Sequence, residues 1–223
     1  MHEFTEWPKT KRLFRDIVVT EKLNGTNSAV HLTPIADWEA DLISTVSGDG
    51  GPHVVEADGV QWAVTAQSRK RIITPGKTTD NYGFAGWVYD NAADLVRILG
   101  EGLHFGEWWG KGIQCGYGLD ERRFSLFNTA RWWAVDEVTG TSMNARSEQS
   151  DLYGQVDAVP VLYEGPFSEA QITSALRDLE QDGSYAAPGF MSPEGICVYH
   201  SQSRNVYKVT LDNQDAGKWE VAA

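Results

Sequence analysis

The sequence has 223 residues and a formal net charge of −12. Apolar residues make up 41% of it and aromatic residues 11%, which excludes global disorder, and no apolar run reaches the about 18 residues of a membrane span. The first residues contain no apolar stretch typical of a secretory signal. Cys115 and Cys197 are too few for a disulfide framework, so we expect a cytoplasmic protein (host cytoplasm if viral).

Acidic charge gathers in two segments of the sequence. Residues 37–58 carry a net charge of −6 and residues 136–194 a net charge of −9, which leaves +3 for the rest. The ordinary interpretation of a basic cluster on such a chain is a solvated face, and the alternative is a phosphate-contacting surface. The basic clusters are Lys9–Arg15, Arg69–Lys77 and Arg122–Arg123.

Short runs rich in β-branched and aromatic residues predict a fold dominated by strands. In chain order, these runs cover residues 17–21, 28–33, 60–66, 103–108, 124–128, 131–138, 159–164, 195–200 and 205–211.

Two segments predict helices. An apolar stripe over residues 85–99 ends at Gly100, and a capping box of Ser168 and Gln171 begins a helix over residues 169–181. The chain shows no repeat and no linker. We therefore expect an α+β fold in a single domain, with mostly antiparallel sheets and a few flanking helices.

The segment EKLNGTN, residues 21–27, lies between two predicted strands. It places Lys22 at the end of a strand, directly before a turn that contains Gly25. A lysine becomes a nucleophile when a cationic or desolvated environment favours its neutral form, and a nucleotide bound with a divalent metal could present a phosphate to it. The ordinary alternative is an Asn-Gly turn beside a surface lysine.

Further short motifs follow this segment in a fixed order. They are Ser68-Arg69, Phe105-Gly106-Glu107, Phe124-x-x-Phe127, Glu194-Gly195 and Tyr207-Lys208. With them the sequence resembles the covalent nucleotidyltransferases, and most closely ATP-dependent RNA ligases of the phage RNA ligase 2 and RNA-editing ligase type. The resemblance implies one adenylyltransferase domain over residues 1–223, an ATP-grasp-like ligase core that ends shortly after the last motif and has no OB-fold.

The resemblance also implies roles for the residues of the first motif. Lys22 would attack the α-phosphate of ATP, and Glu21 would face the adenine. Asn24 and Gly25 would form the nucleotide-binding turn, with Asn24 standing where the family usually has Asp or His. Asn27 would lie near the phosphates and the hydration shell of the metal.

The later motifs supply the remaining contacts in this resemblance. Arg69 would contact phosphate or ribose, or else belong to a solvated strand edge. Glu107 would accept hydrogen bonds from the ribose, and Phe127 would stack on the purine, or else pack in the core. Glu194 would hold Mg²⁺ or Mn²⁺. Lys208 would neutralise the α-phosphate in the transition state, alone, because the usual second lysine of this motif is absent.

The function implied is that of a minimal ATP-dependent RNA ligase. It would form lysyl-AMP, transfer AMP to a 5′-phosphate and join that end to a 3′-OH. Its partners would be ATP, RNA with such ends and an accessory protein that strengthens binding to nucleic acid. No membrane would be involved. Two alternatives remain: a minimal ATP-dependent DNA nick ligase, and a non-catalytic nucleotide- or RNA-binding relic, which Asn24 and Thr210 favour. Of the nine tryptophans, Trp108 and Trp109 are the candidates for stacking on unpaired bases.

Overall fold

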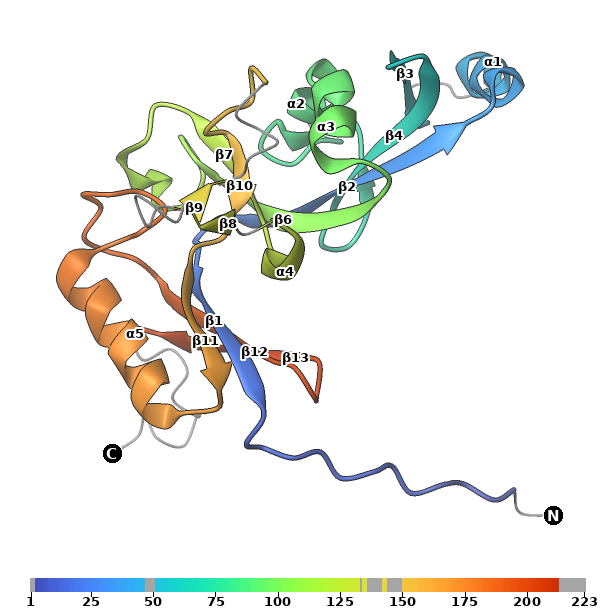
Figure 1. The fold of residues 1–223 in the computed structure, drawn as a ribbon. Coiled ribbons are helices and arrows are strands. Elements are labelled where there is room, and N and C mark those ends of the chain that lie inside the picture. Colours follow the sequence, from blue (N-terminus) through green and yellow to red (C-terminus); the bar gives the residue numbers. More distant parts are fainter. Residues whose placement is uncertain (1–2, 47–50, 133, 136–141, 144–149, 213–223) are drawn as a thin grey trace. The chain divides into compact units, whose positions relative to one another are not determined.

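The structure is a computed structural model that describes residues 3–46, 51–132, 134–135, 142–143 and 150–212 (Figure 1). The chain divides into two compact units. Unit 1 comprises Met1–Lys22 and Val161–Ala223, and unit 2 comprises Leu23–Pro160. In both units the described sheets are mostly antiparallel, which confirms the predicted α+β class. No helix in the described ranges is long and apolar enough to cross a membrane.

Unit 2 is built on a sheet with the strand order β10-β7-β6-β2-β4-β3, to which β5 adds by pairing with β4. All of these strands pair antiparallel except β10, which lies parallel to β7. The strands are β2 (Thr26–Ile35), β3 (His53–Ala57), β4 (Val60–Ser68), β5 (Ile72–Ile73), β6 (Gly102–Gly110), β7 (Arg122–Leu126) and β10 (Val156–Ala158).

Helices cover one face of this sheet and close the core of unit 2 (Figure 1). They bury alternate residues of the strands, such as Val30, Leu32 and Trp108. The helical elements of unit 2 are α1 (Asp37–Val46), α2 (Phe84–Asp90), α3 (Ala92–Leu99), the 3₁₀ turn η1 (Gly116–Gly118) and α4 (Thr129–Trp132).

The single helix predicted over residues 85–99 is wrong, because the structure forms two helices that meet at Asn91. The backbone of Asn91 leaves the helical region (φ −114°, ψ 19°), and its side-chain amide donates to the carbonyl of Trp87 at 2.7 Å. The side chain thus satisfies a carbonyl at the end of α2, as an asparagine does near helix ends.

Part of the strand predicted over residues 131–138 is also different in the structure. Residues 129–132 form α4, because the backbone N–H groups of Arg131 and Trp132 both donate to the carbonyl of Asn128. The short strands β8 (Ala134–Val135) and β9 (Ser142–Met143) then pair antiparallel. The rest of the predicted strand lies outside the described residues.

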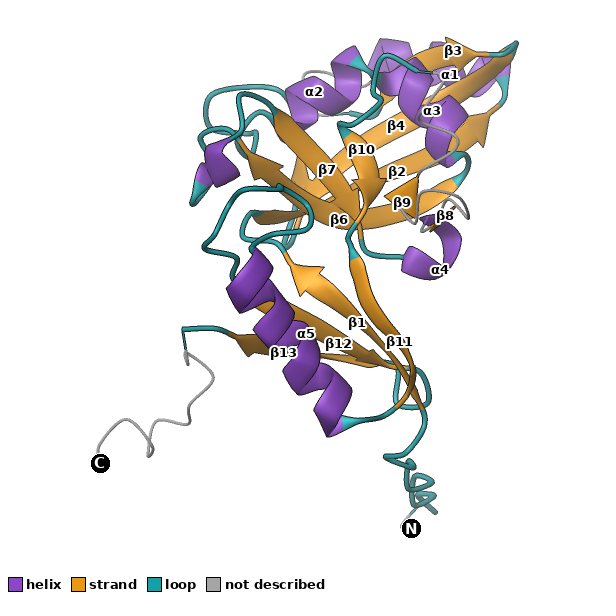
Figure 2. Cartoon of the chain, turned by 60° about the vertical axis from the view of Figure 1, so that its left-hand side comes forward, coloured by secondary structure: helices purple, strands orange, loops and turns teal. Residues whose placement is uncertain are grey.

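Unit 1 has its own sheet and its own core. The strand order is β11-β1-β12-β13, and α5 (Glu169–Asp182) packs on one face (Figure 2). The hydroxyl of Ser168 accepts from the N–H of Gln171 at 3.3 Å at the start of α5, which confirms the predicted helix start. The strands are β1 (Asp16–Lys22), β11 (Val161–Pro166), β12 (Gly195–His200) and β13 (Asn205–Thr210).

Strand β1 alternates between the two faces of this sheet. Ile17, Val19 and Glu21 are buried on the side of α5, where Ile17 and Val19 pack with Ile196 and Leu179. Lys22 ends the strand and points to the opposite face. The sequence alternation therefore decides which side chains of β1 are available for chemistry.

Candidate active site

Lys22 is ion-paired with the glutamate that the sequence analysis assigned to metal binding. Its Nζ lies 2.6 Å from Oε2 of Glu194, and about three quarters of each side chain is shielded from solvent. The backbone explains the meeting, because Lys22 pairs with Gly195 in the β1–β12 register and Glu194 directly precedes Gly195. The structure thus brings these two predicted residues together within unit 1.

Lys208 lies on the same face of this sheet as Lys22. Across β1, β12 and β13, one row of opposite residues consists of Thr20, Cys197 and Lys208. The next row on the same face consists of Lys22, Gly195 and Thr210. Residues opposite each other in a sheet share a face, so both lysines lie on the side away from α5. The motif position without a lysine, Thr210, is the one in the row of Lys22.

Gly195 permits the close pairing in that row. A Cβ at this position would lie 2.2 Å from the carbonyl oxygen of Val209 and 2.8 Å from the Cα of Thr210, and its φ is +144°. Both the space and the backbone conformation therefore require glycine. The Glu-Gly pair of the predicted motif thus combines a carboxylate for Lys22 with a position that lets β13 approach.

Glu21 lies on the other face of β1 and is buried. Its carboxylate accepts hydrogen bonds from the Ser184 hydroxyl at 2.5 Å and from the backbone N–H groups of Tyr185 at 2.9 Å and Ala186 at 3.0 Å. Burial raises the pKa of Glu21 above 4.5, and these hydrogen bonds oppose the shift. In the structure both oxygens bind the segment before β12, while the predicted contact with adenine stays a prediction.

In unit 2, the turn after Lys22 packs tightly against β6. A Cβ at Gly25 would lie 2.5 Å from the carbonyl oxygen of Trp108 and 2.7 Å from the Cβ of Trp109. The backbone N–H of Asn24 donates to the hydroxyl of Tyr117 at 2.7 Å. Gly25 is therefore required by close approach to a neighbouring strand, and the contact of Asn24 fixes the start of the turn.

Three predicted nucleotide-binding residues lie on one face of the unit 2 sheet. Asn27 pairs with Glu107 in the β2–β6 register, and Glu107 pairs with Ser125 of β7. Phe127 directly follows β7, two residues after Ser125 and on the same side of the chain, and its side chain is 41% exposed. This face lies opposite the side that packs on α2 and α3. A carboxylate, an amide and an exposed aromatic ring thus share one surface.

Arg69 lies apart from this row. It belongs to the exposed turn between β4 and β5, where the N–H of Ser68 donates to the carbonyl of Arg71 at 2.8 Å. The turn begins beside Ser28, which pairs with Ser68. The structure therefore holds the backbone of the turn and leaves the Arg69 side chain at the surface.

Trp108 and Trp109 are core residues, so the idea that they stack on unpaired bases is wrong. Each is 1% exposed. Trp108 packs among Phe84 and Trp87, while the indole N–H of Trp109 donates to the Ser125 hydroxyl at 2.8 Å. Trp109 thus lies on the same face of β6 as Glu107, where it holds the Ser125 hydroxyl opposite that glutamate.

The family model described as RNA ligase matches residues 15–210, most of the chain. This chain belongs to the RNA ligase family. The matched range contains all of the motif residues, from Glu21 to Lys208.

The fold is similar to that of an RNA ligase from Naegleria gruberi. A mutant with ATP and Mn matches with a TM-score of 0.50 at 16% identity, over 89% of this chain and 49% of that chain. A second mutant, with AMP and Mn, matches with a TM-score of 0.49 at 17% identity, over 90% of this chain and 51% of that chain. The chain spans about half the length of these ligases. No curated protein matches it significantly in sequence.

Two residues that contact the predicted site residues were given no role by the sequence reasoning, although Phe105 was named there as part of a motif. Phe105 lies on the same face as Glu107 and is 45% exposed, and its carbonyl accepts from the N–H of Phe127 at 2.9 Å. Its position two residues before Glu107 could have revealed it. Tyr117 comes from a glycine-rich loop and has a φ of +53°, and no pattern in the sequence marks it.

Beside Lys22, Glu194 offers a carboxylate that could hold a divalent metal. Oε2 of Glu194 is buried and faces Lys22 Nζ. In the described ranges, no group of three or more His, Cys, Asp or Glu residues could hold a metal by itself. Such a donor set fits Mg²⁺ or Mn²⁺ bound mainly through phosphate and water oxygens.

Proposed function

We propose that this chain is a minimal ATP-dependent RNA ligase that works through a covalent lysyl-AMP. The observation that carries the proposal is the ion pair of Lys22 with Glu194, on the face of unit 1 that also bears Lys208. It lies inside a family match that covers most of the chain. In this role residues 1–223 act as one adenylyltransferase domain.

In the first step Lys22 Nζ attacks the α-phosphorus of ATP. A nitrogen–phosphorus bond forms, the bond to the β-phosphate oxygen breaks, and pyrophosphate leaves. The paired ammonium has no lone pair, so the 2.6 Å contact with Glu194 must open and the amine must lose a proton before attack. Glu194 would hold a divalent metal, which would supply positive charge for the phosphates, and Lys208 adds positive charge on the same face.

The remaining steps use RNA with a 5′-phosphate and a 3′-OH. A 5′-phosphate oxygen attacks the α-phosphorus, which releases Lys22 and forms a 5′–5′ pyrophosphate linkage. The 3′-OH then attacks the RNA phosphate, the phosphodiester forms, and AMP leaves. The unit 2 face supports nucleotide binding, because Glu107 offers acceptors for ribose hydroxyls and Phe127 offers a ring for adenine. Asn27 and Arg69 would serve the phosphates.

The enzyme would act together with a partner protein and in the cytoplasm. An accessory protein would add grip on RNA, since the chain is acidic as a whole. The enzyme would work in a reducing cytoplasm, in which the thiols of Cys115 and Cys197 stay unoxidised.

Self-labelling tests this function. The chain is incubated with α-labelled ATP and Mg²⁺ or Mn²⁺, denatured, and examined for covalent label. We expect acid-labile label on the wild type and none on Lys22→Ala, with Lys111→Ala as a control that removes an exposed lysine elsewhere. Equal labelling of wild type and Lys22→Ala would refute the catalytic role. Sealing of nicks with RNA or DNA 3′-OH strands then separates RNA from DNA ligation.

A further inference from the structure

A pocket in unit 1 lies on the face of its sheet opposite Lys22. It has a volume of about 380 Å³, within the range of roughly 300–1,000 Å³ typical of ligand sites. Ile17 lies on the same face of β1 as Val19 and Glu21, so the pocket opens on the α5 side of the sheet. Ile17 pairs with His200 near the start of β1, so the pocket lies at the other end of this strand from Lys22. The lining residues are Lys11, Arg12, Leu13, Ile17, Phe167, Val198, His200, Ser203 and Tyr207.

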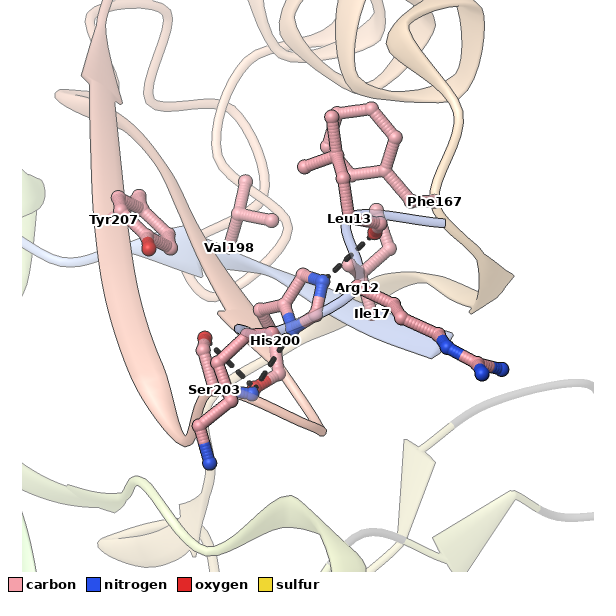
Figure 3. A pocket seen from close by; sticks show the side chains of 9 residues that line it. Arg12, Leu13, Ile17, Phe167, Val198, His200, Ser203 and Tyr207 are labelled. Carbon is pink, nitrogen blue, oxygen red and sulfur yellow. Dashed lines mark hydrogen bonds between the residues drawn. The ribbon is translucent and has the colours of Figure 1, made fainter. Parts of the chain in front are cut away.

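The wall of this pocket is organised by His200, which is 5% exposed. Its Nδ1 accepts from the N–H of Ser203 at 3.2 Å, so the proton is on Nε2, which donates to the carbonyl of Leu13 at 2.8 Å (Figure 3). The N–H of Arg12 also donates to the Gln202 side chain at 2.5 Å. These contacts tie the segment before β1 to the turn between β12 and β13.

The chemistry of the lining combines an apolar base, an aromatic ring and positive charge. Ile17 and Val198 are 0% and 5% exposed, while Tyr207 is 54% exposed beside them. Lys11 and Arg12 add two cations at the rim, and both are exposed. The pocket thus offers an aromatic ring for an unpaired base and, on another side of its rim, Arg12 for a phosphate (Figure 3).

We propose that this pocket is a subsite for single-stranded RNA, with a base against Tyr207 and phosphates on Lys11 and Arg12. The inference rests on the proposed function, which supplies RNA as the substrate. A polynucleotide fits better than a free nucleotide, because residues 7–15 contain four basic residues and no acid. Fully extended, Lys9 to Arg15 reaches up to about 20 Å, farther than the phosphates of one nucleotide. This basic cluster contrasts with the net charge of −12 of the whole chain.

The test measures binding of a short 5′-phosphorylated single-stranded RNA by fluorescence anisotropy at several salt concentrations. We expect Lys11→Ala/Arg12→Ala to weaken binding about tenfold. The slope of log affinity against log salt should fall by about 1.4, that is about 0.7 for each lost phosphate contact. Tyr207→Leu should weaken binding about fivefold or more and leave the salt slope unchanged. Lys111→Ala/Arg177→Ala is the control, because it removes the same charge from exposed sites outside the pocket.

Two outcomes would overturn the subsite. The first is a loss of RNA affinity in Lys11→Ala/Arg12→Ala that is no larger than the loss in the control. The second is displacement of the bound RNA by poly-glutamate as efficiently as by unlabelled RNA, because this would indicate a surface that binds anions or acidic peptides in general. Self-labelling with ATP is measured on the same variants and should stay within about twofold of wild type. If the protein binds RNA through the pocket but does not self-label, the proposed function is refuted, while the assignment of the subsite is kept.

Discussion

At the scale of single residues, Glu21 is the most unusual group beside the proposed nucleophile. It is 1% exposed, and its carboxylate holds Ser184, Tyr185 and Ala186. Because burial raises its pKa, the folded state binds its proton more tightly than the unfolded state does. The contribution of Glu21 to stability is therefore greatest below about pH 4.5 and falls as pH rises through its pKa in the folded state.

Glu21→Gln tests this pH dependence, because it removes the charge and keeps one acceptor oxygen. We expect the free energy of unfolding of Glu21→Gln, relative to wild type, to rise with pH from about 4.5 upward. Urea unfolding at a series of pH values measures it, and a difference that does not change with pH would contradict the assignment. Glu21→Ala should cost roughly 1–3 kcal/mol at neutral pH, since it leaves buried donors without an acceptor.

Gly25 gives a second prediction at this scale. A Cβ there would meet the backbone of Trp108, which cannot rotate away as a flexible side chain could. We expect Gly25→Ala to lose about 1–3 kcal/mol of stability, measured by thermal or urea unfolding, and to reduce self-labelling with ATP.

Gly86→Ala is the matched control. Its Cβ would lie 3.6 Å from the Asp80 carboxylate, an ordinary contact, inside helix α2. This change should be neutral or stabilise the protein by up to about 1 kcal/mol. If both alanine variants unfold alike, the close packing of Gly25 on β6 does not limit stability.

At the scale of elements, β6 divides its side chains between two tasks. Trp108 and His104 are buried on one face, while Phe105 and Glu107 lie on the other. The period of two of a strand explains this division, whereas Glu107, which is half-buried, was singled out by its place in the order of the motifs. The alternation could not show that Trp109 would also be buried, because the cover comes from Tyr117, whose ring lies 4.7 Å from it.

The exposed aromatic beside that face should matter for binding and not for folding. We expect Phe127→Ala to weaken binding of a non-hydrolysable ATP analogue by about 1–3 kcal/mol, roughly five- to hundredfold, because a base loses its stacking partner. Calorimetric titration measures the affinity. Tyr153→Ala removes another exposed aromatic of unit 2 and should leave affinity unchanged. A large loss of thermal stability in Phe127→Ala would instead assign this ring to the core.

Other elements could be predicted only in part, for physical reasons that differ among them. Helix α5 was visible because Ser168 caps a clear apolar stripe, whereas α1 exposes Trp38 and Leu42 and has no such stripe facing the core. The ion pair of Lys22 with Glu194 could not be read from the sequence, since it depends on the β1–β12 register. The order of the motifs nevertheless identified both residues before any geometry was known.

At the scale of the whole molecule, the two units differ in how the chain forms them. Unit 2 is one continuous segment, Leu23–Pro160, with a buried core of its own. We expect the excised segment to fold cooperatively, as shown by a sigmoidal urea transition and dispersed amide resonances. A protein with no cooperative transition would show that the continuous core is insufficient by itself.

The strand order of unit 1 also has a consequence for synthesis on the ribosome. β1 pairs only with β11 and β12 among the described strands, and β11 begins about 140 residues after β1 ends. Domains generally fold as units during synthesis, in the order in which they leave the ribosome. Unit 2 can therefore fold before β11 and β12, the strands that pair with β1, have been translated. During this interval Lys22 has been translated and Glu194 has not. The amine proposed to carry AMP therefore leaves the ribosome early, and it gains its carboxylate partner only after about 170 further residues have been translated.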